Sequence, residues 1–230
     1  MFTDIALIAA LRHELKPLLS MGNWRLDKIA GRNFYRRTVA GKAVVATTSG
    51  LGKVMAAATT QMLIDRFGVD LILNFGSCGA LAPGLKVGDL VLAEKVIEYD
   101  FTSEHKSVPV TECDADLLSS LRARFPEFKV GPLASADRNA DTPEVREDLF
   151  SRYQALVADW EGASIVRVAK RMGLPALVLR GVTDIGAAEL SHEYENNYQK
   201  VLPEVAQSVD EIIKFMLAMK PQPVVPAGDN

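Results

Sequence analysis

Three acidic residues stand out because each lies at the end of an apolar stretch of the chain: Glu14, Glu161 and Asp184. Carboxyl groups in such positions can activate water, stabilise a developing positive charge or donate a proton. A carboxylic acid that donates at neutral pH needs a raised pKa, which burial or a nearby anion produces. Asp184 follows an apolar strand and is placed for that role.

Each acid, taken alone, also has a simpler interpretation. Glu14 is typical of a solvated helix residue, Glu161 of a first-turn acid favoured by the helix dipole, and Asp184 of a helix N-cap. The three acids indicate a site only if the fold brings them together.

Apolar patterning predicts the elements that would do so. Short apolar runs predict strands at 5–10, 69–75, 90–97, 130–134, 155–158 and 176–182, with a hairpin formed by 34–39 and 42–48. Helical spacing predicts a helix after residue 11 and helices at 54–67, 115–124, 143–153, 162–172 and 194–219. We expect Thr142 and Pro143 to begin the helix at 143–153, and Pro203 to kink or break the last helix.

Strands that alternate with helices predict an α/β fold, with a mixed, mostly parallel central sheet between two helical layers. Ligands bind such sheets at the carboxyl ends of the strands, where the three acids lie. A chain of 230 residues, 48% of them hydrophobic, fits one domain. We expect this domain to span residues 1–220, with a disordered Pro-rich tail at 221–230.

Composition narrows the possible partners. The 26 Lys and Arg residues against 29 Asp and Glu residues give a net charge of -3, without long blocks of one sign. This balance argues against nucleic acid or a membrane surface and favours a small-molecule substrate. The N-terminal residues lack a signal-peptide pattern, and neither the two cysteines nor the histidines have metal-ligand spacing. We expect a cytoplasmic protein without metal or cofactor.

Four stretches of the chain carry a family resemblance. They are Ala9-Ala10-Leu11-Arg12-His13-Glu14, Ser49-Gly50-Leu51-Gly52-Lys53, Asn74-Phe75-Gly76-Ser77-Cys78-Gly79, and Asp159-Trp160-Glu161-Gly162-Ala163 followed by Arg180-Gly181-Val182-Thr183-Asp184. Each is a weak motif, but their order after the expected strands resembles the 5'-methylthioadenosine/S-adenosylhomocysteine nucleosidases of the purine nucleoside phosphorylase superfamily.

This resemblance implies catalytic roles for Glu14, which would activate the attacking water, and Asp184, which would protonate N7 of the purine. Glu161 would accept hydrogen bonds from the ribose hydroxyls. The implied substrate-binding residues also include Arg180 and Ser77 near the ribose, Asp137 and Ala140 in the loop beside the base, and Trp160, for which packing is favoured over base stacking.

Two departures from the family pattern bear on the reaction and the substrate. Asn74 stands where the hexameric purine phosphorylases have a phosphate-binding Arg, which favours water as the nucleophile, although Arg12 in the first loop could still serve an anion. The loop 138–141 lacks the aromatic residue that usually stacks on the base.

We therefore expect a homodimeric nucleosidase that releases adenine from methylthioadenosine or adenosylhomocysteine. A hydrolase or phosphorylase acting on another nucleoside, such as futalosine or an adenosyl compound, stays open. A non-catalytic nucleoside-binding protein is the alternative from another class.

Overall fold

The computed structural model describes residues 2–101, 107–186 and 190–219. Its strands are β1 (Asp4–Ala9), β2 (Arg25–Ile29), β3 (Arg32–Val39), β4 (Lys42–Thr48), β5 (Leu71–Ala80), β6 (Leu90–Glu98), β7 (Val110–Glu112), β8 (Lys129–Ser135), β9 (Val157–Asp159) and β10 (Ala176–Asp184). Its helices are α1 (Arg12–Ser20), α2 (Lys53–Phe67), α3 (Ala115–Arg124), α4 (Pro143–Tyr153), α5 (Gly162–Arg171) and α6 (Leu190–Ala218).

The strands form one mixed sheet in the order β10-β6-β8-β9-β5-β1-β4-β3-β2, with β7 paired to β6. The parallel pairs β1–β4, β1–β5 and β5–β10 form its centre. Because β10 also pairs with both β5 and β6, the strands β10, β6, β8, β9 and β5 close into a ring. The mixed α/β fold predicted from the sequence is confirmed, whereas the ring was not foreseen.

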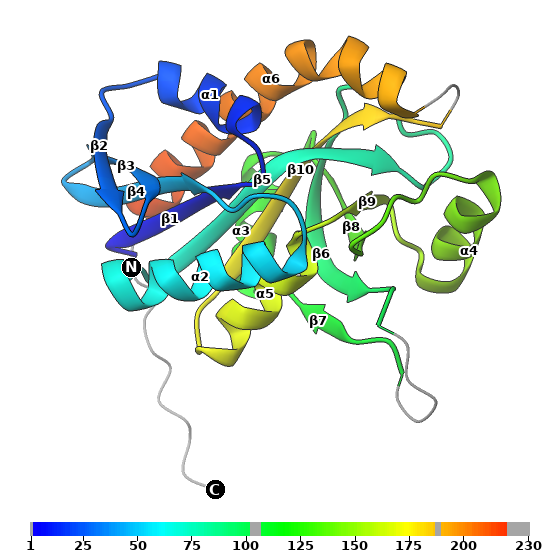
Figure 1. Ribbon diagram of the computed structural model, residues 1–230, viewed down its shortest axis with the longest axis horizontal. Helices are drawn as coiled ribbons and strands as arrows, with labels where there is room; N and C mark the ends of the chain where they lie inside the picture. Colours follow the sequence, from blue (N-terminus) through cyan, green and yellow to red (C-terminus); the bar gives the residue numbers. More distant parts are fainter. Residues whose placement is uncertain (1, 102–106, 187–189, 220–230) are drawn as a thin grey trace, which may run out of the picture.

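Helices cover both faces of the sheet. Figure 1 shows α1 and α6 on one face, with α2 and α5 on the opposite face. Two buried apolar clusters fill the space between these layers: one includes Leu7, Leu73 and Val205, and the other includes Ile8, Ile72 and Ile165. Strands β1, β5 and β10 are buried along almost their whole length, which explains their nearly continuous apolar runs.

Several predicted details are changed by the structure. The strand predicted to end at Phe75 continues through the Gly76–Gly79 motif to Ala80, because β10 extends alongside it. Of the kink or break predicted at Pro203, the break is absent, since α6 runs through it as one helix of 29 residues in which Val201 and Val205 are buried. The predicted tail at 221–230 lies outside the described residues.

The missed β2–β3 hairpin turns at Ala30-Gly31, just as the predicted β3–β4 hairpin turns at Ala40-Gly41. All four residues have positive φ, between 49° and 78°, as a two-residue turn of this kind requires. The predicted start of α4 is confirmed, because the side chain of Thr142 accepts a hydrogen bond from the backbone N–H of Val145 and Pro143 is the first helical residue.

Candidate active site

A cavity of about 300 Å³ lies where β1, β5, β9 and β10 end. Of the predicted site residues, those that line it are Glu14, Ser77, Ala140, Trp160, Glu161 and Asp184. All three acids are nearly buried, with exposed fractions of 4%, 5% and 9% for Glu14, Glu161 and Asp184. The fold therefore brings the three carboxyl groups to one cavity.

Glu14 is held by four hydrogen-bond donors. Its Oε2 accepts from the backbone N–H groups of Ala10 and Leu11 at 3.0 and 2.9 Å, and its Oε1 accepts from the N–H and hydroxyl of Ser77 at 2.9 and 2.7 Å. A Cβ at position 76 would lie 2.6 Å from Oε1, so Gly76 makes room for the carboxylate. Four donors fix the direction of both oxygens.

Glu161 lies at the residue before α5 and accepts a hydrogen bond from the backbone N–H of Gly52, at 2.9 Å. Burial, followed by the charge of Asp159, raises the pKa of Glu161 to about 7. This group can therefore change its charge close to neutral pH.

A buried ion pair joins Arg180 of β10 to Asp159 of β9. The guanidinium of Arg180, 2% exposed, donates to Asp159 Oδ2 through Nε at 2.9 Å and through Nη2, and also reaches Asn74 Oδ1. Asn74 in turn donates to the carbonyl of Ile8, at 2.9 Å. These contacts tie the middle of β5 and of β10 to the ends of β1 and β9.

Asp184 is the last residue of β10, and its Oδ1 lies 2.8 Å from Nη2 of Arg146 on α4. Burial raises the pKa of Asp184 and the pairing with Arg146 opposes that rise, with a net increase from the ordinary value. A Cβ at position 79 would lie 2.8 Å from Oδ1, so Gly79 provides the space that this carboxyl occupies.

Residues 4–214 match the model of the family described as Phosphorylase superfamily. The chain belongs to this superfamily. It is 30% identical to a 5'-methylthioadenosine/S-adenosylhomocysteine nucleosidase of Tolumonas auensis, over 83% of this chain and 90% of that protein. It is also 28% identical to an aminodeoxyfutalosine nucleosidase of Helicobacter pylori, over 94% of this chain and 99% of that one.

Among solved structures, a methylthioadenosine/adenosylhomocysteine nucleosidase from S. pneumoniae with a transition-state inhibitor superposes with a TM-score of 0.85. It is 27% identical, and the match covers 93% of this chain and 99% of that one. The predictions of a nucleoside phosphorylase-like fold and of a nucleosidase are confirmed by these relatives.

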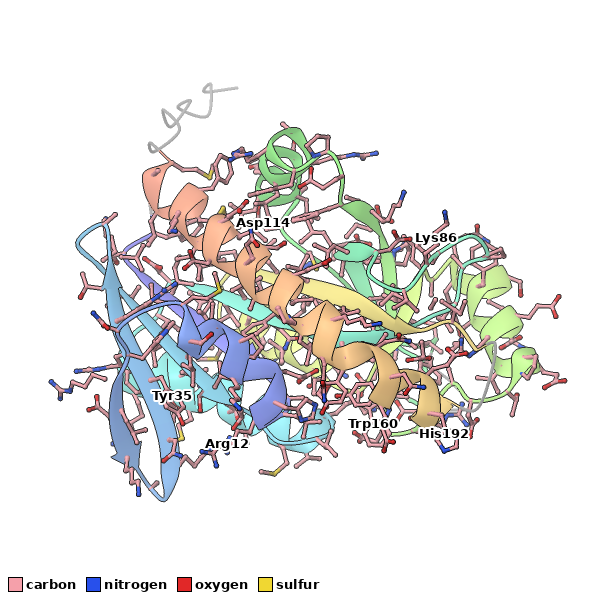
Figure 2. The ribbon with its side chains drawn as sticks, turned by 90° about the horizontal axis from the view of Figure 1, so that it is seen from above. Arg12, Tyr35, Lys86, Asp114, Trp160 and His192 are labelled. Atoms are coloured by element: carbon pink, nitrogen blue, oxygen red, sulfur yellow. The ribbon has the colours of Figure 1, made fainter. Side chains whose placement is uncertain are left out.

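Three residues that the sequence suggested for ligand binding do not line the cavity. Arg180 lies beneath the cavity, where its donors face Asp159 and Asn74. Asp137 lies outside the lining and accepts from the backbone N–H of Lys53 at the start of α2, at 2.7 Å. Arg12 is exposed and borders a separate hollow with Tyr35 (Figure 2), rather than the cavity that the three acids line.

The loop 138–141 has no aromatic residue, but two other segments bring aromatic side chains to the cavity. Trp160 lines it from the turn before α5, and Figure 2 shows this residue toward the end of α6 that carries His192. Tyr194 lines it from α6, with its hydroxyl against His13 Nε2 and its ring stacked on Tyr198 at 5.4 Å.

Sequence reasoning missed Tyr194 and Arg146. Burial raises the pKa of Tyr194 to about 12, so its hydroxyl keeps its proton near neutral pH. Each residue lies in a predicted helix and belongs to no local motif. Its place beside the cavity follows only from the packing of α4 and α6 against the sheet edge.

Within the residues that the structure describes, no helix is both long and apolar enough to cross a membrane. The same residues include no group of three or more His, Cys, Asp or Glu side chains arranged to hold a metal ion.

Proposed function

We propose that this protein hydrolyses the N-ribosidic bond of a 5'-substituted adenosine, methylthioadenosine or adenosylhomocysteine, and releases adenine. The observation that carries the proposal is the position of the Glu14 carboxylate. It accepts hydrogen bonds from the backbone N–H groups of Ala10, Leu11 and Ser77. These donors are therefore not available to a phosphate anion, which would need such groups. A negative charge at that position disfavours phosphate and suits a base that activates water.

The reaction assigns one task to each acid. As the bond between C1' and the base breaks, its electron pair moves to the base, and Asp184 transfers a proton to N7 of the purine. Glu161 accepts hydrogen bonds from the ribose hydroxyls, and its negative charge stabilises the cationic sugar. Glu14 takes a proton from the water whose oxygen bonds to C1', with Ser77 beside it.

The remaining residues support these three. Arg180 holds the end of β9 against β10 through Asp159, a role beneath the substrate rather than in contact with it. Ala140 and Trp160 would flank the base, since both line the cavity. Asp137 would hold the start of α2, whose Gly52 contacts Glu161.

A second substrate is supported by the aminodeoxyfutalosine nucleosidase of Helicobacter pylori, which aligns with nearly the whole chain. The loop 138–141 offers no aromatic residue to stack on the base. Both candidates are nucleosides cleaved at the same bond, so the roles of the acids are common to them.

The proposal includes a homodimer. Leu51, Val54 and Met55 form an apolar patch at the start of α2, with exposed fractions of 53%, 76% and 45%, and Leu51 also lines the cavity. A second copy that covers this patch would remove apolar surface from water beside the substrate. Light scattering should give the mass of a dimer, Val54→Lys should weaken it, and Val87→Lys should leave it intact. A monomeric parent protein at working concentrations would contradict the proposal.

We also propose a cytoplasmic location, supported by two buried cysteines that form no disulfide.

The experiment that tests the function measures base release from a panel of nucleosides, including methylthioadenosine, adenosylhomocysteine, aminodeoxyfutalosine and adenosine. Each is incubated in phosphate-free buffer and in buffer with phosphate, and the sugar product is identified. We expect adenine and the free 5'-substituted ribose in both buffers. Strict dependence on phosphate with a ribose 1-phosphate product would instead indicate a phosphorylase. Tight binding without any base release would indicate a nucleoside-binding protein.

A further inference from the structure

Arg146 is a half-buried arginine whose guanidinium reaches three segments around the base end of the cavity. From α4, its Nη2 donates to Asp184 Oδ1, its Nε to the carbonyl of Ala140 and its Nη1 to the carbonyl of Ala80, each at 2.8 Å. These partners lie at the end of β10, in the loop before α4 and at the end of β5. One side chain therefore joins the proposed acid to both neighbouring walls.

The surroundings of Arg146 leave little freedom for this guanidinium. A Cβ at position 186 would lie 2.6 Å from its Nη1, and a Cβ at position 79 would lie 3.4 Å from its Nη2. Gly79 and Gly186 therefore allow the backbone to approach the planar group from two sides. All three nitrogens face acceptors, so the position of Arg146 also fixes Oδ1 of Asp184.

We propose that Arg146 is the positioning residue for proton donation by Asp184: it holds Oδ1 so that Oδ2 is directed to the base, and it stabilises the carboxylate left after the proton is transferred. This inference rests on the proposed function and adds a residue to it. The proton moves from Asp184 to N7 as the C1'–base electron pair moves to the base. The new carboxylate then pairs with the guanidinium 2.8 Å away.

The other charged and titratable groups near Asp184 do not duplicate this role. Glu193 of α6 adds a negative charge that favours the protonated acid. Cys78 of β5 keeps its proton because burial raises its pKa well above the usual value. Arg138, which lines the same cavity, lies against the ring of Tyr99. Arg146 is thus the cation in direct contact with the acid.

The test replaces Arg146 with Met, which keeps an unbranched chain and removes the charge. The matched control is Arg152→Met, on the same helix, where the arginine is largely exposed and pairs with Asp148 of the preceding turn. Steady-state kinetics for base release from the best substrate are measured across pH. We expect Arg146→Met to lower kcat by about tenfold or more, since general-acid catalysis is worth about 10²–10⁴-fold and the acid itself remains.

The pH profile separates catalysis from structure. Without the neighbouring cation, Asp184 holds its proton to higher pH, so the alkaline limb of the kcat/KM profile should move upward by about one to three pH units. Arg146→Lys, which keeps the charge, should leave this limb near its parental position. In an Asp184→Asn background, Arg146→Met should cause little additional loss of kcat.

Two results would overturn the inference. One is an Arg146→Met variant with the kcat of the parent and an unmoved alkaline limb. The other is an Arg146→Met substitution that lowers kcat as much in the Asp184→Asn background as in the parent. If thermal melting shows that Arg146→Met does not fold, Arg146→Gln replaces it, because Gln removes the charge and keeps a donor. If the parent and Arg152→Met both fail to release base, the proposed function fails and this inference fails with it. If the parent is active and Asp184→Asn is impaired, a parental Arg146→Met overturns this inference alone.

Discussion

The two ends of the cavity hold their carboxyl groups in different ways. At the sugar end, Glu14 accepts three backbone N–H groups and one hydroxyl, so its position follows from the paths of β5 and of the turn after β1. At the base end, Asp184 accepts from side chains, Nη2 of Arg146 at 2.8 Å and the hydroxyl of Thr183 at 3.4 Å, of which the guanidinium is the closer and charged donor. The sugar end is therefore fixed by the fold, whereas the base end can be altered by one substitution. The latter is also where the loop 138–141 departs from the family pattern.

The largest effect is expected from Glu14→Gln, because the amide cannot match its surroundings. Its NH₂ group would face N–H donors that now point at a carboxylate, in addition to the loss of the base that activates water. We expect kcat to fall by about 10³-fold or more, with a smaller change in ligand affinity. Single-turnover base release and calorimetric binding of an unreactive nucleoside analogue would measure the two effects.

Glu147→Gln, an exposed position on α4, serves as the control. Retention of near-parental kcat by Glu14→Gln would show that the four donors hold a structural anion and that water is activated elsewhere.

Asp184→Asn should cause the next largest loss, about 10²-fold in kcat. The Asn oxygen can still accept from Arg146, so the geometry at the base end is kept while the acid is removed. Ligand affinity should change much less than the rate. Near-parental turnover in this variant would contradict proton donation by Asp184, because Asp184 would then serve only as a structural partner of Arg146.

The pH dependence of catalysis should report Glu161. Its pKa is raised to about 7 by burial and by Asp159, so the carboxylate gains a proton as the pH falls through that value. We expect kcat/KM to fall about tenfold per pH unit below about pH 7, because the protonated group no longer stabilises the cationic sugar. In Glu161→Gln, activity should be low throughout, and this acidic limb should be absent. An unchanged limb in that variant would assign it to another group.

The same shift has a consequence for stability, with a defined sign. The folded-state pKa of Glu161 lies above the ordinary value of 4.5, so folding favours its protonated form. This contribution is fully present below about pH 4.5 and is lost as the pH rises through about 7. Between pH 5 and 8, the free energy of unfolding should therefore decrease more in the parent than in Glu161→Gln, as urea denaturation at several pH values would measure.

The smallest effect concerns the helix that carries Arg146. Thr142 caps α4 through its bond to the N–H of Val145, and Thr142→Ala should lower the free energy of unfolding by about 1 kcal/mol. Because three hydrogen bonds anchor the guanidinium of Arg146, kcat should stay within a few-fold of the parent. A loss of kcat as large as that of Arg146→Met would show that the base end depends on the cap as much as on the ion pair.

Local patterns predicted the parts of the molecule that depend on local chemistry. The apolar runs of β1, β5 and β10, and the Thr142-Pro143 start of α4, follow from residues adjacent in the chain. The β2–β3 hairpin could have been found in the same way, because Ala30-Gly31 repeats the turn signal of Ala40-Gly41.

The rest depends on contacts between distant parts of the chain. The sequence could not show that α4 would bring Arg146 to Asp184, because the two residues are joined only through the packing of the sheet edge. The resemblance to a family placed Arg180 next to the substrate, but its pairing with Asp159 draws it beneath the cavity. Pro203 was expected to kink or break the last helix, and the break is absent because the burial of the neighbouring apolar residues keeps α6 continuous.

The closed ring of strands has a consequence for the order in which the molecule is made. Its last strand, β10, pairs with β5 roughly a hundred positions earlier, as in the contact of Leu177 with Leu73, and also with β6. Such long-range pairing is slow to form because a large loop must close first. During synthesis on the ribosome, the residues before β10 can fold only into an open sheet. The cavity lacks part of its wall until β10 and the residues after it, up to Tyr194, have left the exit tunnel.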